Sequence, residues 1–106
     1  MTLAESKCAP CRADTPPLTA EQAEEMLEEV PMWTLKDNAI EREFRFNDFR
    51  QAIDFVTKVA DIAEQQDHHP DIHISYNKVR LELSTHKIGG LSENDFIMAA
   101  KIDRIS

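Results

Sequence analysis

The stretch "DIHISYNKVRLEL", residues 71–83, contains two short runs in which apolar and polar side chains alternate. Alternation with a period of two predicts a strand with one apolar face for each run. The dipeptide Asn77-Lys78 between the two runs fits a tight turn. With that turn the strands form an antiparallel hairpin, in which residues 76, 74 and 72 lie opposite residues 79, 81 and 83.

Helical patterns flank this hairpin on both sides. Residues 47–66 predict a helix that Asn47 or Asp48 caps and that ends near Gln66, because Pro70 follows. Its apolar residues recur at three- and four-residue steps, at Phe49, Ala52, Ile53, Val56, Ala60 and Ala63. After the hairpin, a loop with the only two glycines leads to a last helix, where Ser92 and Asp95 have the spacing of a capping box.

The first half of the chain predicts a helix and a second strand pair. Thr19 and Gln22 also have capping-box spacing, and Pro31 stops the helix that they begin. The runs "MWTL" and "AIEREFRF" predict two strands joined by a turn at "KDN", although Arg42 interrupts the apolar face of the second. The order α-β-β-α-β-β-α predicts an α+β fold over residues 18–106, a four-stranded antiparallel sheet with three helices packed on one face. The polar face is left for water, a partner or a ligand.

Composition excludes several classes of function. The chain has 106 residues, of which 42% are hydrophobic and 30% charged, as in one globular domain. Its formal net charge of −8, with no basic stripe, argues against nucleic-acid binding. The longest apolar run, "FIMAA", is too short to span a bilayer. Because the N-terminus lacks the pattern of a secretory signal, we expect a cytoplasmic protein.

Residues 1–17 predict a flexible N-terminal tail that contains a Cys-x-x-Cys pair, Cys8 and Cys11. Such a pair can be a redox dithiol or half of a zinc site. A zinc site needs a second pair, which the chain lacks, and a thioredoxin-like dithiol lies at a strand–helix junction. Two free thiols in a tail are therefore the favoured interpretation.

Histidine is concentrated near the start of the hairpin. His68 and His69 lie between the long helix and the third strand, and Pro70 restricts their backbone. Hairpin pairing returns the end of the fourth strand, with His86, to this junction, so three imidazoles are expected at one edge of the sheet. Asp95, in the first turn of the last helix, is close enough along the chain to hydrogen-bond His86.

Imidazole gains and loses protons near neutral pH, so this cluster predicts acid/base catalysis, with a carboxylate orienting one ring. Alternatives stay open for the single residues: Asp95 is also a typical helix cap, and His73 fits the polar strand face. His68, His69 and His86 could also ligate zinc with an open fourth position. Adjacent residues seldom ligate one ion comfortably, so metal-free chemistry is favoured, and a nucleophilic mechanism is weaker still.

The spacing of Glu64, His68-His69-Pro70, Tyr76, His86 and Asp95 resembles the signature of the pterin-4a-carbinolamine dehydratases. The stretches "HHPDIHISYNKV" and "STHKIGGLSENDF" are similar to typical members, and the similarity runs from about residue 18 to the C-terminus.

The resemblance implies a hydro-lyase that converts 4a-hydroxytetrahydropterin to quinonoid dihydropterin and water. That reaction recycles the tetrahydropterin cofactor of aromatic amino acid hydroxylation, including phenylalanine hydroxylation. It further implies no metal or organic cofactor, and a homodimer or homotetramer. By carry-over, His68, His69 and His86 line the pterin site, with His69 as the acid that protonates the hydroxyl. Asp95 would orient His86, and Glu64 would hold the imidazole pair or the pterin.

The resemblance also implies a rival from another class, a binding or assembly protein. Some family members act with a transcription regulator, so an aromatic amino acid hydroxylase or a regulatory protein is a candidate partner. Chaperone-like relatives tend to lose the histidine set. This chain keeps it, which favours the enzyme and leaves room for a second role.

Overall fold

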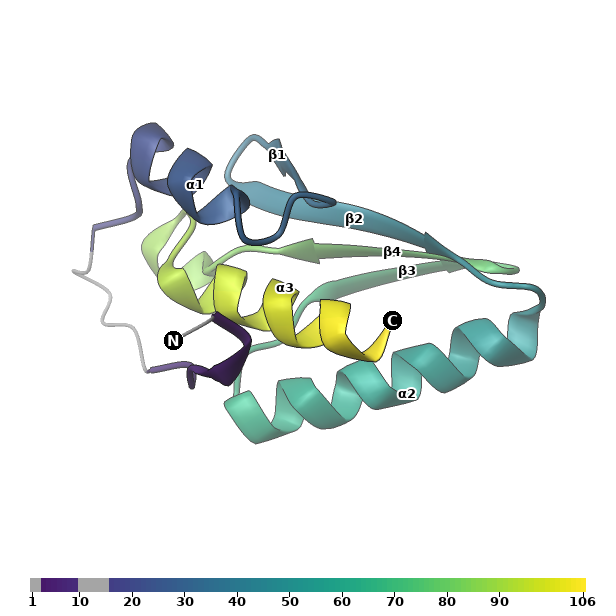
Figure 1. Cartoon of the computed structure of the whole chain (residues 1–106). Coiled ribbons are helices and arrows are strands. Elements are labelled where there is room, and N and C mark those ends of the chain that lie inside the picture. The colour runs from purple at the N-terminus through teal and green to yellow at the C-terminus, as the bar shows by residue number, and fades with distance from the viewer. Residues whose placement is uncertain (1–2, 10–15) are drawn as a thin grey trace.

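The computed structural model describes residues 3–9 and 16–106. Three α-helices and four strands follow one another as α1 (Ala20–Leu27), β1 (Thr34–Lys36), β2 (Ala39–Arg45), α2 (Phe49–Gln66), β3 (Asp71–Ser75), β4 (Lys78–Leu83) and α3 (Glu93–Ile105). Two short 3-10 helices, η1 (Leu3–Glu5) and η2 (His86–Ile88), complete the described part. The predicted α+β class and the order α-β-β-α-β-β-α are confirmed (Figure 1).

The sheet is antiparallel with the strand order β1-β2-β4-β3, so that β4 is central and β3 forms an edge. Helices α2 and α3 contact each other and β4, and Figure 1 shows both on the same face of the sheet. The end of α2, the start of β3 and the end of β4 lie at the same end of the molecule (Figure 1). The topology therefore gathers the two loops that carry histidines.

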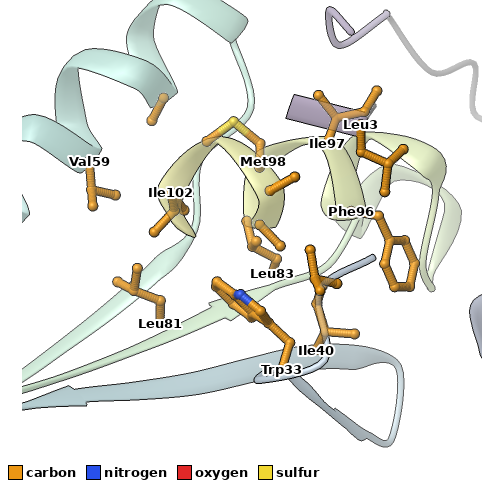
Figure 2. Packing of buried hydrophobic residues seen from close by; sticks show 14 of the residues in the cluster. Leu3, Trp33, Ile40, Val59, Leu81, Leu83, Phe96, Ile97, Met98 and Ile102 are labelled. Atoms are coloured by element: carbon orange, nitrogen blue, oxygen red, sulfur yellow. The ribbon is translucent and has the colours of Figure 1, made fainter. Parts of the chain in front are cut away.

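The hydrophobic core lies between the sheet and α3. From β4, Val79, Leu81 and Leu83 are fully buried, and α3 contributes a nearly continuous set of buried side chains that includes Phe96 and Ile102. Figure 2 shows Leu81 and Leu83 of the sheet beside Phe96 and Ile102 of the helix. Because α3 is covered on most sides, its N-terminus is held rigidly, and this end carries Asp95.

The β3–β4 hairpin has a different register from the predicted one. Ile74 lies opposite Val79 and Ile72 lies opposite Leu81, so the turn residues are Tyr76 and Asn77 instead of Asn77 and Lys78. Tyr76 has a positive φ of 54°, which is rare for an aromatic residue and which its sequence context does not signal. The pairing is displaced by two residues, and the face of each side chain is therefore unchanged.

Helix α2 has the predicted ends, with Asp48 as N-cap and Gln66 as its last residue. Its buried stripe, however, is Ala52, Phe55, Val59 and Ala63. Of the predicted stripe only Ala52 and Ala63 are buried, while Phe49 is half exposed. Two apolar stripes run along this helix, and packing against α3 and β4 selects the one centred on Phe55 and Val59.

Arg42, which interrupts the apolar pattern of β2, is accommodated at the margin of the core. Its guanidinium group lies 4.3 Å from the ring centre of Phe44, and Nη1 donates to Asp103 Oδ1 of α3 at 2.7 Å. The indole Nε1 of Trp33 donates to the same oxygen at 2.9 Å. The charge is thus paired where it is half-buried, and it ties β2 to the end of α3.

The region predicted as a tail is in part packed on the domain. Leu3 is buried in the core cluster, and Lys101 Nζ of α3 donates to the carbonyl of Ala4 at 2.9 Å. Cys8 Sγ donates to the carbonyl of Asn94 at 3.6 Å, whereas Cys11 lies outside the described residues. The division of the chain at residue 17 stays a prediction. In the described part of the chain, no helix is both long and apolar enough to cross a membrane.

Candidate active site

A cavity of about 390 Å³ opens where the loop after α2 meets the loop after β4. All three predicted imidazoles line it, together with further residues that include Asp67, Thr85 and Asn94. Its volume is within the range of small-molecule sites, roughly 300–1,000 Å³. The sequence therefore predicted the convergence of His68, His69 and His86 correctly, even though the hairpin register was wrong.

The end of α2 places the two adjacent histidines. Asp67 adopts the left-handed conformation with φ 52° and ψ 42°, and its N–H donates to the carbonyl of Ala63. The N–H of His68 also donates to Ala63 at 3.2 Å, and this stops the helix within one residue. Pro70 then favours extended backbone at His69. The chain leaves the helix sharply, and both rings reach the cavity.

The buried carboxylate of Asp95 contacts His68 and not His86. His68 Nε2 lies 2.6 Å from Asp95 Oδ1, and the His68 side chain is largely buried. A carboxylate only accepts hydrogen bonds, so this contact requires a proton on Nε2 and leaves Nδ1 as the acceptor of the neutral ring. The expectation that Asp95 bonds His86 is wrong, because β4 ends at Leu83 and His86 turns away into η2.

The second oxygen of Asp95 is held by two donors. Thr85 Oγ1 and the N–H of Ser92 each donate to Asp95 Oδ2 at 2.9 Å. Because the Thr85 hydroxyl hydrogen points to Asp95, the Ser92 hydroxyl donates to Thr85 Oγ1 at 2.7 Å. The bond from Ser92 is the carboxylate half of the predicted capping box. The two interpretations of Asp95, as helix cap and as partner of an imidazole, therefore both hold.

His69 is paired with the carboxylate of Glu64 at the mouth of the cavity. His69 Nε2 lies 2.7 Å from Glu64 Oε2, and both side chains are exposed. Glu64 is in the last turn of α2, five residues before His69, so the left-handed residue Asp67 brings the pair together. The expectation was that Glu64 holds the imidazole pair or the pterin, and the structure shows its contact with His69.

His86 is the first residue of η2, is exposed and lines the same cavity. The loop around it is closed by hydrogen bonds in both directions between Thr85 and Gly90. Gly90 must lack a side chain, because a Cβ atom there would lie 2.8 Å from Pro17 Cβ. This contact fixes the position of the loop that carries Thr85 and His86.

The structure also bears on metal binding and on the fourth histidine, His73. Within residues 3–9 and 16–106, no group of three or more His, Cys, Asp and Glu side chains is arranged to hold a metal ion. His73 lies half exposed on the open face of the sheet, 3.7 Å from Glu82, as its strand position indicated. Sequence reasoning missed Thr85 and Asn94, because a lone hydroxyl or amide residue carries no spacing signal.

Three imidazoles line one small cavity, and two of them are paired with carboxylates, an arrangement that can accept and donate protons. The family model described as pterin 4 alpha carbinolamine dehydratase matches residues 16–105. The chain therefore belongs to the pterin-4-alpha-carbinolamine dehydratase family, whose members are hydro-lyases.

Individual relatives agree with this assignment. A protein of Methylococcus capsulatus named "Putative pterin-4-alpha-carbinolamine dehydratase" is 51% identical over 99% of this chain and 94% of the relative. A protein of Nitrosomonas eutropha with the same name is 50% identical over 97% of this chain and 92% of the relative. A crystal structure described as a transcriptional coactivator/pterin dehydratase from Brucella melitensis superposes with a TM-score of 0.80 at 38% identity. It covers 84% of this chain and 97% of that one.

Proposed function

We propose that this chain dehydrates 4a-hydroxytetrahydropterin to quinonoid dihydropterin by histidine acid/base catalysis. The observation that carries the proposal is the single cavity lined by His68, His69 and His86, in which two of the rings are backed by carboxylates. Membership in the dehydratase family supports the reaction class.

The reaction requires two proton transfers and no redox step. The bond between C4a and the hydroxyl oxygen breaks, and the oxygen leaves as water with a proton from the imidazolium of His69. The proton on N5 passes to a base, and the electron pair of the N5–H bond forms the new double bond between N5 and C4a. His68 suits the base, because Asp95 holds its Nε2 proton and leaves Nδ1 free to accept. His86, which lines the same cavity, would bind the pterin ring.

The test is the rate at which 4a-hydroxytetrahydropterin absorbance disappears when the purified protein is added. We expect clear acceleration by the wild-type chain, and His69→Ala should reduce kcat by about 10²-fold or more, because general-acid assistance is lost. His73→Ala is the matched control, since this histidine lies on the open sheet face and should have no effect. Equal rates with and without the wild-type protein would overturn the proposal.

The cellular role that we propose is recycling of the tetrahydropterin cofactor after aromatic amino acid hydroxylation, in the cytoplasm. The acidic net charge of −8 does not oppose a pterin ligand, which is recognised through directional hydrogen bonds. An aromatic amino acid hydroxylase in the same cell would be the source of the substrate.

We also propose that the chain forms a homodimer or homotetramer, and that a regulatory partner is a second role to test. Several large apolar side chains are exposed, which supports association: Met32, Leu35, Phe49, Ile72, Ile74 and Tyr76. The Brucella melitensis relative carries both coactivator and dehydratase in its description, which supports a regulatory partner. The mass from analytical ultracentrifugation would test the first point.

A further inference from the structure

The N-terminal segment Leu3–Ala9, here called the strap, is fastened at its start to α3. Leu3 is only 7% exposed and lies in the core cluster with Phe96 and Ile97, as Figure 2 shows. Helix η1 contacts α3, and the bond from Lys101 Nζ to the carbonyl of Ala4 fixes the next residue. An apolar anchor and a charged donor thus give this segment a defined course (Figure 1).

The far end of the strap is fastened by a reciprocal pair of hydrogen bonds. Asn94 Nδ2 donates to the carbonyl of Ala9 at 2.6 Å, and the N–H of Ala9 donates to Asn94 Oδ1 at 2.9 Å. Asn94 is 7% exposed, so little water competes for its amide. One residue earlier, the N–H of Cys8 donates to Gln66 Oε1 at 2.9 Å. These bonds hold the end of the strap by its backbone, and Cys8 Sγ adds a side-chain bond to the carbonyl of Asn94 at 3.6 Å.

The two residues that hold the strap end are neighbours of the paired catalytic candidates. Gln66 is the last residue of α2, two positions before His68, and Asn94 immediately precedes Asp95. The strap end and the His68–Asp95 hydrogen bond therefore span the same two elements. Ala9 itself lines the cavity beside the three histidines.

We propose that the strap forms one wall of the pterin site and that Asn94 is the positioning residue that holds this wall in place. This inference rests on the proposed function, because it assigns the cavity to a pterin. Ala9 limits the cavity on one side, and a ligand seated against the histidines packs on its backbone and methyl group. The strap therefore contributes to substrate binding and leaves the proton transfers to the histidines.

The experiment compares three full-length variants with the wild type. Asn94→Ala removes both hydrogen bonds to Ala9, and Ala9→Phe puts a large side chain at the cavity wall while all backbone contacts remain. Arg104→Ala is the matched control, because it breaks the exposed 3.6 Å contact between Arg104 and Glu5 of the strap, which does not line the cavity. Circular dichroism and thermal unfolding check the fold, and Ala9→Phe alters only an exposed position.

We expect Asn94→Ala and Ala9→Phe each to raise KM by about tenfold or more while kcat changes by less than about threefold, which is the signature of lost binding. The dissociation constant of 7,8-dihydropterin, measured by fluorescence titration, should rise by a similar factor. Arg104→Ala should leave both values unchanged.

If the strap has only a structural role, we expect a different result. The melting temperature falls in Asn94→Ala, while KM and the dihydropterin affinity of Asn94→Ala and Ala9→Phe stay at the wild-type values. That result would overturn the inference. The dihydropterin titration does not depend on turnover. A wild-type chain that binds dihydropterin without dehydrating the 4a-hydroxypterin would overturn the proposed function alone.

Discussion

The site contains two carboxylate–imidazole pairs that have almost the same geometry and opposite surroundings. The His68–Asp95 distance is 2.6 Å and the His69–Glu64 distance is 2.7 Å. The side chains of the first pair are 12% and 0% exposed, whereas those of the second are 56% and 78% exposed. Distance alone therefore does not distinguish the two pairs.

Burial and additional hydrogen-bond partners distinguish the two pairs. Asp95 accepts from His68, Thr85 and the N–H of Ser92, so its position is determined by three donors on three segments. Within residues 3–9 and 16–106, the Glu64 carboxylate hydrogen-bonds only His69, and it stands in solvent, where screening and side-chain entropy weaken an ion pair. We infer that the first pair fixes a ring rigidly and that the second leaves His69 free to reorient during the reaction.

The largest effect should follow from Asp95→Ala. The change leaves three buried donors without their acceptor, and breaking a buried pair in this way costs about 3–5 kcal/mol of unfolding free energy. His68 also loses the group that fixes its protonated nitrogen, so kcat should fall by about 10²-fold or more. Urea unfolding and single-turnover kinetics measure the two losses separately.

Asp95→Asn is the matched control for this prediction. The amide oxygen can still accept from Thr85 and Ser92, so most of the stability should remain, whereas the amide N–H₂ would face His68 and place its proton on Nδ1. We expect kcat nearly as low as in Asp95→Ala. Wild-type turnover in Asp95→Asn would contradict the role of Asp95 in orienting His68.

A smaller effect is expected for Thr85→Val, which keeps the shape of the side chain and removes the hydroxyl donor. Asp95 then loses one of its hydrogen bonds and the Ser92 hydroxyl loses its acceptor, which should cost about 1–3 kcal/mol of stability. Thr85→Ser restores the donor and should recover most of the loss in denaturant titrations. Equal stability of the Val and Ser variants would show that the hydroxyl does not support the buried pair.

The smallest effect should come from Glu64→Gln. An exposed ion pair contributes less than about 1 kcal/mol, and the amide can still hydrogen-bond the ring, so kcat should change by less than about threefold. Steady-state kinetics with the 4a-hydroxypterin measure this. A loss as large as that of Asp95→Ala would mean that the two pairs are equivalent in function, and the comparison would fail.

Much of the fold could be predicted because its local signals agree with one another. The capping box of Thr19 and Gln22 forms as expected, and α2 ends at Gln66 before the proline. What failed was the choice between locally equivalent alternatives. Helix α2 has two apolar stripes, and packing against α3 and β4 decides which of them is buried. Similarly, no local sequence signal indicates that Tyr76 takes the left-handed conformation.

For the site, the sequence predicted which residues line one cavity but not which of them hydrogen-bond each other. The prediction that His68, His69 and His86 come together held despite the wrong register, because a two-residue shift leaves each strand residue on the same face. The predicted hydrogen-bond partner of Asp95 was wrong, because the partner depends on where β4 ends and on the 3-10 turn that follows it. Thr85 and Asn94 matter through buried hydrogen bonds that only the folded chain forms.

Asp95 starts a helix and orients an imidazole with the same two oxygen atoms. We expect Asp95→Ala to lower both stability and turnover, so two separate requirements would constrain this residue. In a descendant of this chain that had a regulatory role and no enzymatic activity, His68 or His69 could be substituted first, because neither histidine caps a helix. Such a descendant would keep the aspartate, because the residue caps α3. The order in which these side chains are lost would therefore indicate the change from an enzymatic to a regulatory role.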